Sequence, residues 1–147
     1  MNQIPKLSVE LVPESSWGSN LRSMLSRAEW DVLRKACYKK ANYRCEICGG
    51  QGRQHPVECH EVWEYNDQAH VQKLIRLIAL CPACHEVKHM GRAEIIGRGP
   101  QAFAHLLKAN NWTPKQAQKH ISEAQSIWEA RSEFEWKLDI SILKIKN

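Results

Sequence analysis

The chain of 147 residues contains no apolar run long enough to cross a lipid bilayer. Its first residues, Met-Asn-Gln-Ile-Pro, lack the basic and then apolar pattern of a signal peptide. The sequence also has no low-complexity tract and no internal repeat. These absences argue against membrane, secreted and repeat proteins, so we expect a cytoplasmic protein without a membrane partner.

A disulfide framework is also not expected, although the chain has six cysteines. In a protein that stays inside the cell, cysteines are typical metal ligands or core residues. A chain of this length can bury roughly two thirds of its unfolded surface in one core. We therefore expect a single domain over residues 1–147. The net charge of +5 is compatible with phosphate contacts but does not identify a partner, and nothing in the sequence indicates an oligomeric state.

Alternating apolar and polar residues predict a strand near each end of the chain. The first covers Lys6–Leu11, and the second contains Leu138, Ile140 and Ile142. We expect these two strands to pair with each other, which would hold both ends of the chain in one domain.

Two capping patterns predict helices. Ser26 and Glu29 form a capping box, and the apolar positions that follow include Cys37, which we interpret as a core residue. Thr113, followed by Pro and then by Gln116, marks the start of a second helix. The stretch Gly91–Pro100 is rich in glycine and is expected to separate a metal-binding part from a C-terminal helical extension of about residues 100–147.

The middle of the chain is predicted to contain strands followed by a short helix. Alternation indicates a strand over Val57–Tyr65, and Val71–Leu80 favours a helical or turn portion that leads into a strand. Pro82 suits the first turn of a helix, so Ala83–His89 should be helical. Together with the flanking helices, these elements predict an α+β fold.

Two Cys-x-x-Cys pairs predict a structural zinc site. The four residues are Cys45, Cys48, Cys81 and Cys84. Four thiolates complete the tetrahedral coordination of Zn²⁺ and leave no open position. The free energy of zinc binding would therefore contribute directly to folding.

Three histidines form a second candidate cluster. His85 and His89 are four residues apart, so their rings lie on the same face of a helix. His60 lies on the strand between the two cysteine pairs, and the chain must return from this strand to the zinc at Cys81. We expect that return to bring His60 near His85.

The order of these motifs resembles the HNH endonuclease family. The motifs are C-x-x-C, a strand with His in E-x-H-x-V, and then L-C-P-x-C-H-x-x-K-H, over about residues 43–91. The resemblance implies a ββα-metal core built on a treble-clef-like zinc site, with helices and a terminal strand pair around it. It also implies metal-dependent hydrolysis of phosphodiester bonds. The catalytic ion would be a second divalent ion, such as Mg²⁺, Mn²⁺, Ni²⁺ or Zn²⁺.

The resemblance assigns roles to individual residues. His85 and His89 match the helix residues that bind the catalytic ion, and His60 is central on the strand. If Cys59 and His60 form the strand pair, His60 is the general base and the thiol is a ligand. If His60 and Glu61 form the pair, His60 is a ligand and Glu61 is the base. The family pattern favours the second register, and alternation places Cys59 on the apolar face.

Arg76 stands where the family has an asparagine that stiffens a loop. It would either approach a phosphate or remain solvated.

Several basic residues bracket the cluster in sequence: Lys39, Lys40, Arg44, Arg53, Lys88, Arg92 and Arg98. They predict nucleic acid, and in particular DNA, as the partner, bound through its backbone with weak specificity. The competing hypothesis is a non-catalytic zinc-binding module that contacts nucleic acid or a protein.

Overall fold

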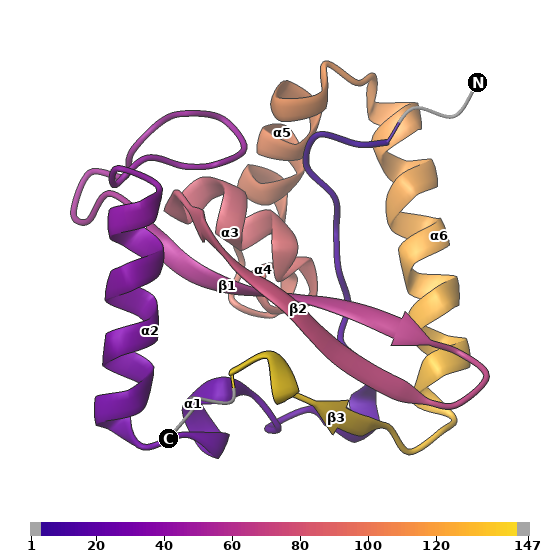
Figure 1. Ribbon diagram of the computed structural model, residues 1–147. Helices are drawn as coiled ribbons and strands as arrows, with labels where there is room; N and C mark the ends of the chain where they lie inside the picture. Colours follow the sequence, from indigo (N-terminus) through magenta and orange to yellow (C-terminus); the bar gives the residue numbers. More distant parts are fainter. Residues whose placement is uncertain (1–3, 144–147) are drawn as a thin grey trace.

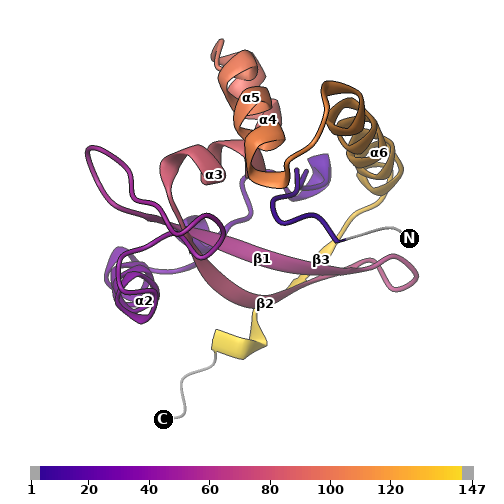
Figure 2. The same cartoon turned by 90° about the horizontal axis from the view of Figure 1, so that it is seen from above.

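The computed structural model describes residues 4–143 of the chain. A three-stranded sheet has helices on both of its faces (Figure 1, Figure 2). The predicted α+β fold is therefore confirmed. Over the described residues, no helix combines the length and the apolar character that crossing a membrane requires.

The secondary structure alternates between helical and extended parts. In chain order, its elements are the 3-10 helix η1 (Glu14–Ser16), α1 (Leu21–Met24), α2 (Arg27–Lys40), β1 (Glu58–Asn66), β2 (Val71–Leu80), α3 (Pro82–Lys88), α4 (Met90–Ile95), α5 (Gly99–Asn110), α6 (Pro114–Ser132), β3 (Lys137–Asp139) and the 3-10 helix η2 (Ser141–Leu143). The two predicted capping boxes are present at the starts of α2 and α6.

Strands β1 and β2 form a long antiparallel hairpin that leads directly into α3. At the hairpin turn, the Asn66 side chain accepts hydrogen bonds from the backbone N–H groups of Gln68 and Ala69, at 3.0 and 2.9 Å. The predicted helical start of Val71–Leu80 is wrong, because this whole segment is a strand. Pairing with β1 along its entire length outweighs the helical spacing of its apolar residues.

The predicted pairing of the two terminal strands is also wrong. The segment 6–11 is not a strand, and β3 pairs in parallel with the start of β2 instead. The alternation did report burial correctly, because Leu7 and Val9 are buried. Their backbone N–H groups, however, donate to side chains of the C-terminal helices: to Asn110 Oδ1 at 3.1 Å and to His120 Nε2 at 2.9 Å. The segment therefore lies against α5 and α6 (Figure 1).

Replacing Asn110 with alanine is expected to destabilise the protein by about 1–3 kcal/mol. The Asn110 amide accepts from Leu7 N and donates to Leu7 O at 2.7 Å, so its loss leaves two backbone groups without partners. Urea unfolding followed by circular dichroism measures the change. Gln118→Ala removes an exposed amide from α6 and should change stability by less than about 0.5 kcal/mol. Equal losses in the two variants would contradict the role of Asn110 as an anchor.

The stretch 91–100 is not the separating loop that its composition predicts. Helix α4 covers Met90–Ile95 and α5 begins at Gly99, so only a short turn lies between them. Gly97 has φ +80°, a conformation that other residues rarely adopt, which allows this tight connection.

Two clusters of buried side chains cover the two faces of the sheet. The larger cluster joins the N-terminal segment, the cysteine pairs, α3, α4, α5 and α6, and the smaller one joins α1 and α2 to β2. Figure 2 shows α2 on one side of the sheet and α3 to α6 on the other. Cys37, predicted as a core residue, is only half-buried.

Candidate metal centres

The four cysteines of the Cys-x-x-Cys pairs lie together. Their Sγ atoms are all within 4.8 Å of one another, so they could hold a metal ion such as zinc. One pair comes from the loop before β1 and the other from the start of α3. The prediction that these four residues form a metal cluster agrees with the structure.

Backbone N–H groups surround the sulfur atoms of this cluster. The N–H groups of Ile47 and Cys48 donate to Cys45 Sγ at 3.4 and 3.5 Å, and that of Cys84 donates to Cys81 Sγ at 3.5 Å. The hydrogen bond from the Cys84 thiol lowers the pKa of Cys45, and the backbone N–H groups add to this effect although burial opposes it. Burial raises the pKa of Cys81, and the bond with Cys45 raises that of Cys84. The thiolate is the form that binds zinc, and the backbone N–H groups at Cys45 stabilise this form.

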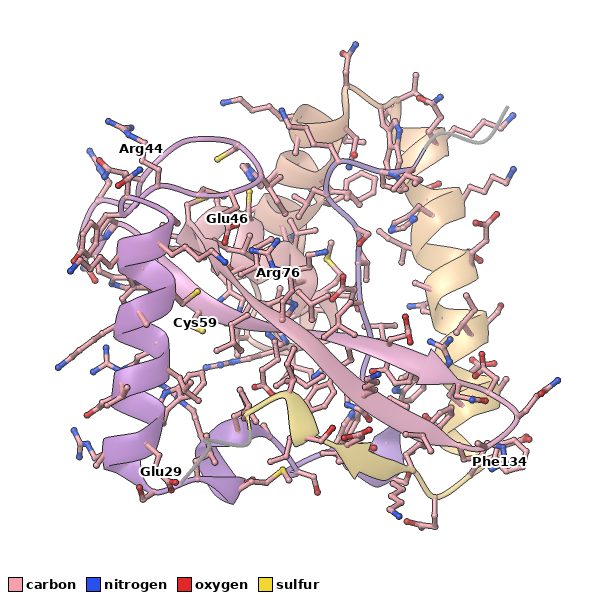
Figure 3. All side chains as sticks on the ribbon, viewed as in Figure 1. Glu29, Arg44, Glu46, Cys59, Arg76 and Phe134 are labelled. Carbon is pink, nitrogen blue, oxygen red and sulfur yellow. The ribbon has the colours of Figure 1, made fainter. Side chains whose placement is uncertain are left out.

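The first cysteine pair is fixed to β2 through Glu46 (Figure 3). Glu46 N donates to Ala79 O at 2.9 Å, and Ala79 N donates back to the Glu46 carboxylate at 2.7 Å. Arg76 donates to the other oxygen of this carboxylate at 2.6 Å. Arg76 thus holds the loop of the first cysteine pair on the strand. This contact gives the side chain a structural role without any phosphate.

Helix α5 contributes a residue that the sequence pattern did not reveal. His105 Nε2 lies 3.2 Å from Cys84 Sγ, so an N–H group of this ring can donate to the sulfur. Such contacts orient metal ligands and adjust their basicity. His105 is 21 residues beyond Cys84, and no spacing rule links the two.

His60, His85 and His89 form the second cluster, with their ring nitrogens within 4.8 Å of one another. The rings of His60 and His85 are 5.2 Å apart between centroids, and those of His60 and His89 are 5.3 Å apart. The Nε2 atoms of His85 and His89 face each other at 3.2 Å. The strand β1, the helix α3 and its C-cap residue His89 therefore bring three imidazoles together.

Burial favours the neutral, metal-binding form of two of these imidazoles, those of His60 and His89. Desolvation lowers the pKa of His89 to about 4, and the charges of His85 and His60 add to the shift. Burial also lowers the pKa of His60. Three histidine ligands are a known set for a metal that keeps a fourth position open for water or substrate.

Glu58 fixes the orientation of His85. Its two carboxylate oxygens lie 2.9 Å from His85 Nδ1 and 2.8 Å from His55 Nε2. The hydrogen bond with His85 is the main cause that lowers the pKa of Glu58 to about 2. A carboxylate on Nδ1 leaves Nε2 free to bind a metal. Alternation along β1 places Glu58 and His60 on the same face, and this signal could have identified Glu58 from the sequence.

Glu10 joins the site from the N-terminal segment. Its carboxylate lies 3.2 Å from His60 Nε2 and 2.8 Å from the Nζ of Lys88, which also donates to Ser8 at 3.0 Å. Burial acts to raise the pKa of Glu10, but the bonds with His60 and Lys88 outweigh it and lower the pKa to about 2. Fifty residues separate Glu10 from His60, so no local pattern connects them.

Cys59 and Glu61 lie on the other face of β1, because successive side chains of a strand alternate. Cys59 packs against the smaller buried cluster around Leu21. The Glu61 carboxylate accepts from Leu21 N at 3.4 Å, and burial raises its pKa. The structure thus brings His60, His85 and His89 together, and it does not bring Cys59 or Glu61 to them.

The two clusters differ in the coordination that they could offer to a metal ion. Four thiolates would complete a tetrahedral set, whereas three imidazoles would leave one position open. Comparison of the chain with protein-family models, curated proteins and solved structures found no match.

Two of the basic residues that were predicted to contact nucleic acid form ion pairs with acidic side chains of the protein itself. Lys88 is buried against Glu10, and Arg98 pairs with Glu86 at 2.9 Å. Arg98 is nevertheless exposed, as are the other five basic residues of this set: Lys39, Lys40, Arg44, Arg53 and Arg92.

Proposed function

We propose that the protein is a metal-dependent endonuclease of the HNH type that hydrolyses phosphodiester bonds in DNA. The observation that supports this function best is the convergence of His60, His85 and His89 next to the four-cysteine cluster. The residues of both clusters come from the loop before β1, from β1 and from the two ends of α3, in the order of the motif that resembles the HNH family.

The imidazoles of His60, His85 and His89 hold the catalytic ion in this proposal. When bound there, a divalent ion would supply polarisation of the scissile phosphate and stabilisation of the leaving oxygen. Glu58 keeps His85 in the tautomer that binds through Nε2, and Glu10 orients His60. We do not assign the general base to Glu61, because its carboxylate is bonded to Leu21 N on the other face of β1.

A supercoiled-plasmid assay tests this function. The protein, dialysed to remove loosely bound ions, is expected to leave the plasmid intact and to nick or linearise it when Mg²⁺, Mn²⁺, Ni²⁺ or Zn²⁺ is added. Metal analysis of the same sample should find one tightly bound zinc ion per chain. Intact plasmid with every one of these ions would refute the nuclease function.

A non-catalytic zinc-binding module is the second candidate. It is favoured by the bond of Glu61 to Leu21 N on the other face of β1 and by the contact of Arg76 with Glu46, which engage these two predicted residues elsewhere. Such a module would bind DNA or a protein partner without cleaving the plasmid. The affinity of such a module for its partner would also be unchanged by His85→Ala. This result would distinguish the module from a nuclease that was merely inactive in the preparation.

A further inference from the structure

A cleft of about 450 Å³ lies beside α1 and α2, and none of its lining residues belongs to either metal cluster. Six residues line it: Arg22, Arg27, Trp30, Asp31, Arg34 and Tyr38. Three guanidinium groups and a phenol offer hydrogen-bond donors, the aspartate is purely an acceptor, and the indole N–H of Trp30 is buried. The lining therefore favours a ligand that carries negative charge and several oxygens.

The donors of this cleft are largely free. Asp31 is engaged by Arg34 Nε at 2.8 Å. Arg22 and Arg27 are exposed, and neither makes an ion pair or a side-chain hydrogen bond within residues 4–143. Trp30 is 9% exposed, and its buried Nε1 has no acceptor in the same part of the chain. Guanidinium groups bind phosphate oxygens through paired hydrogen bonds, so a phosphodiester fits this set of donors.

The cleft adjoins the strand that carries His60. Leu21, next to Arg22, donates its backbone N–H to Glu61, which follows His60 in β1. Since β1 is an edge strand, the cleft and the three histidines lie on the two sides of one sheet edge.

We propose that this cleft binds the phosphodiester backbone of the DNA substrate, which then crosses the edge of β1 to the histidine site. The inference rests on the proposed function, because it specifies how the substrate of that site is held. The phosphate contacts would come from Arg22 and Arg27, with Arg34 positioned by Asp31. Contacts of this kind position DNA without reading its sequence.

The experiment measures binding apart from cleavage. Fluorescence anisotropy with a short labelled DNA duplex, without added divalent ions, gives the dissociation constant over a range of salt concentrations. In the Arg22→Gln/Arg27→Gln variant we expect the dissociation constant to rise on the order of tenfold. The slope of log affinity against log salt should fall by about 1.8, because each neutralised phosphate contributes about 0.9.

A second double variant controls for net charge. Lys115 and Lys119 are exposed on α6, far along the chain from the cleft. The variant Lys115→Gln/Lys119→Gln removes two positive charges, as the arginine variant does. It should leave the salt slope unchanged. Equal weakening by both variants, unchanged binding in the arginine variant, or no DNA binding by the unmodified protein would each overturn the proposal. If DNA bound through these arginines but the plasmid stayed intact with every metal ion, the nuclease function would be refuted. The proposal that the cleft binds DNA would still be supported.

Discussion

Replacing Cys81 with serine is expected to remove the tightly bound zinc and to unfold the protein at 25 °C. Cys81 is buried, and its sulfur caps α3 by accepting from Cys84 N at 3.5 Å. Structural zinc contributes about 10–16 kcal/mol in small zinc domains, which is as large as the whole stability of a typical domain of about 5–15 kcal/mol. Far-ultraviolet circular dichroism and metal analysis of the purified variant measure the two effects.

The matched control is Cys37→Ser. Cys37 is a half-buried free thiol in α2 and does not belong to the four-cysteine cluster. This variant should retain one zinc ion per chain and lose no more than about 1–2 kcal/mol of stability. If Cys81→Ser kept its zinc, or if both variants unfolded alike, the four cysteines would not form a structural metal site.

The sequence predicted the features whose causes are local. The capping boxes at Ser26 and Thr113 were identified because a cap is complete within four residues, and the structure contains both. The four-cysteine cluster was identified for the same reason, since each Cys-x-x-Cys pair contains its own turn. The burial of Leu7 and Val9 also followed from alternation.

Features that depend on distant partners could not be predicted in this way. Alternation reports which side chains are buried, but it does not report which groups satisfy the backbone. For the segment 6–11 these groups are the side chains of Asn110 and His120, more than one hundred residues away, rather than another strand. Glu10 was missed at the histidine site for the same physical reason, because only the folded chain brings it to His60 and Lys88.

Replacing His85 with alanine is expected to abolish binding of the second ion and to reduce plasmid cleavage by a factor on the order of 10³ or more. The Nε2 atoms of His85 and His89 are 3.2 Å apart, so both lone pairs can reach one cation. Without His85, only His60 and His89 remain, and Glu58 loses the ring that it orients. Titration calorimetry with Mn²⁺ and the plasmid assay measure the two losses, while metal analysis should still find one zinc ion.

Two further variants determine whether such a loss reflects metal binding. His70→Asn removes a histidine at the hairpin turn and keeps a residue that tolerates the φ of +54° found there, so cleavage should be unchanged. Glu58→Gln keeps the shape of the side chain but removes its charge, and should weaken Mn²⁺ binding by roughly 10–100-fold. The proposed ion site would be refuted if His85→Ala bound Mn²⁺ as tightly as the unmodified protein. An intermediate affinity in Glu58→Gln would instead show that this carboxylate acts on the ion through His85, as their contact at 2.9 Å indicates.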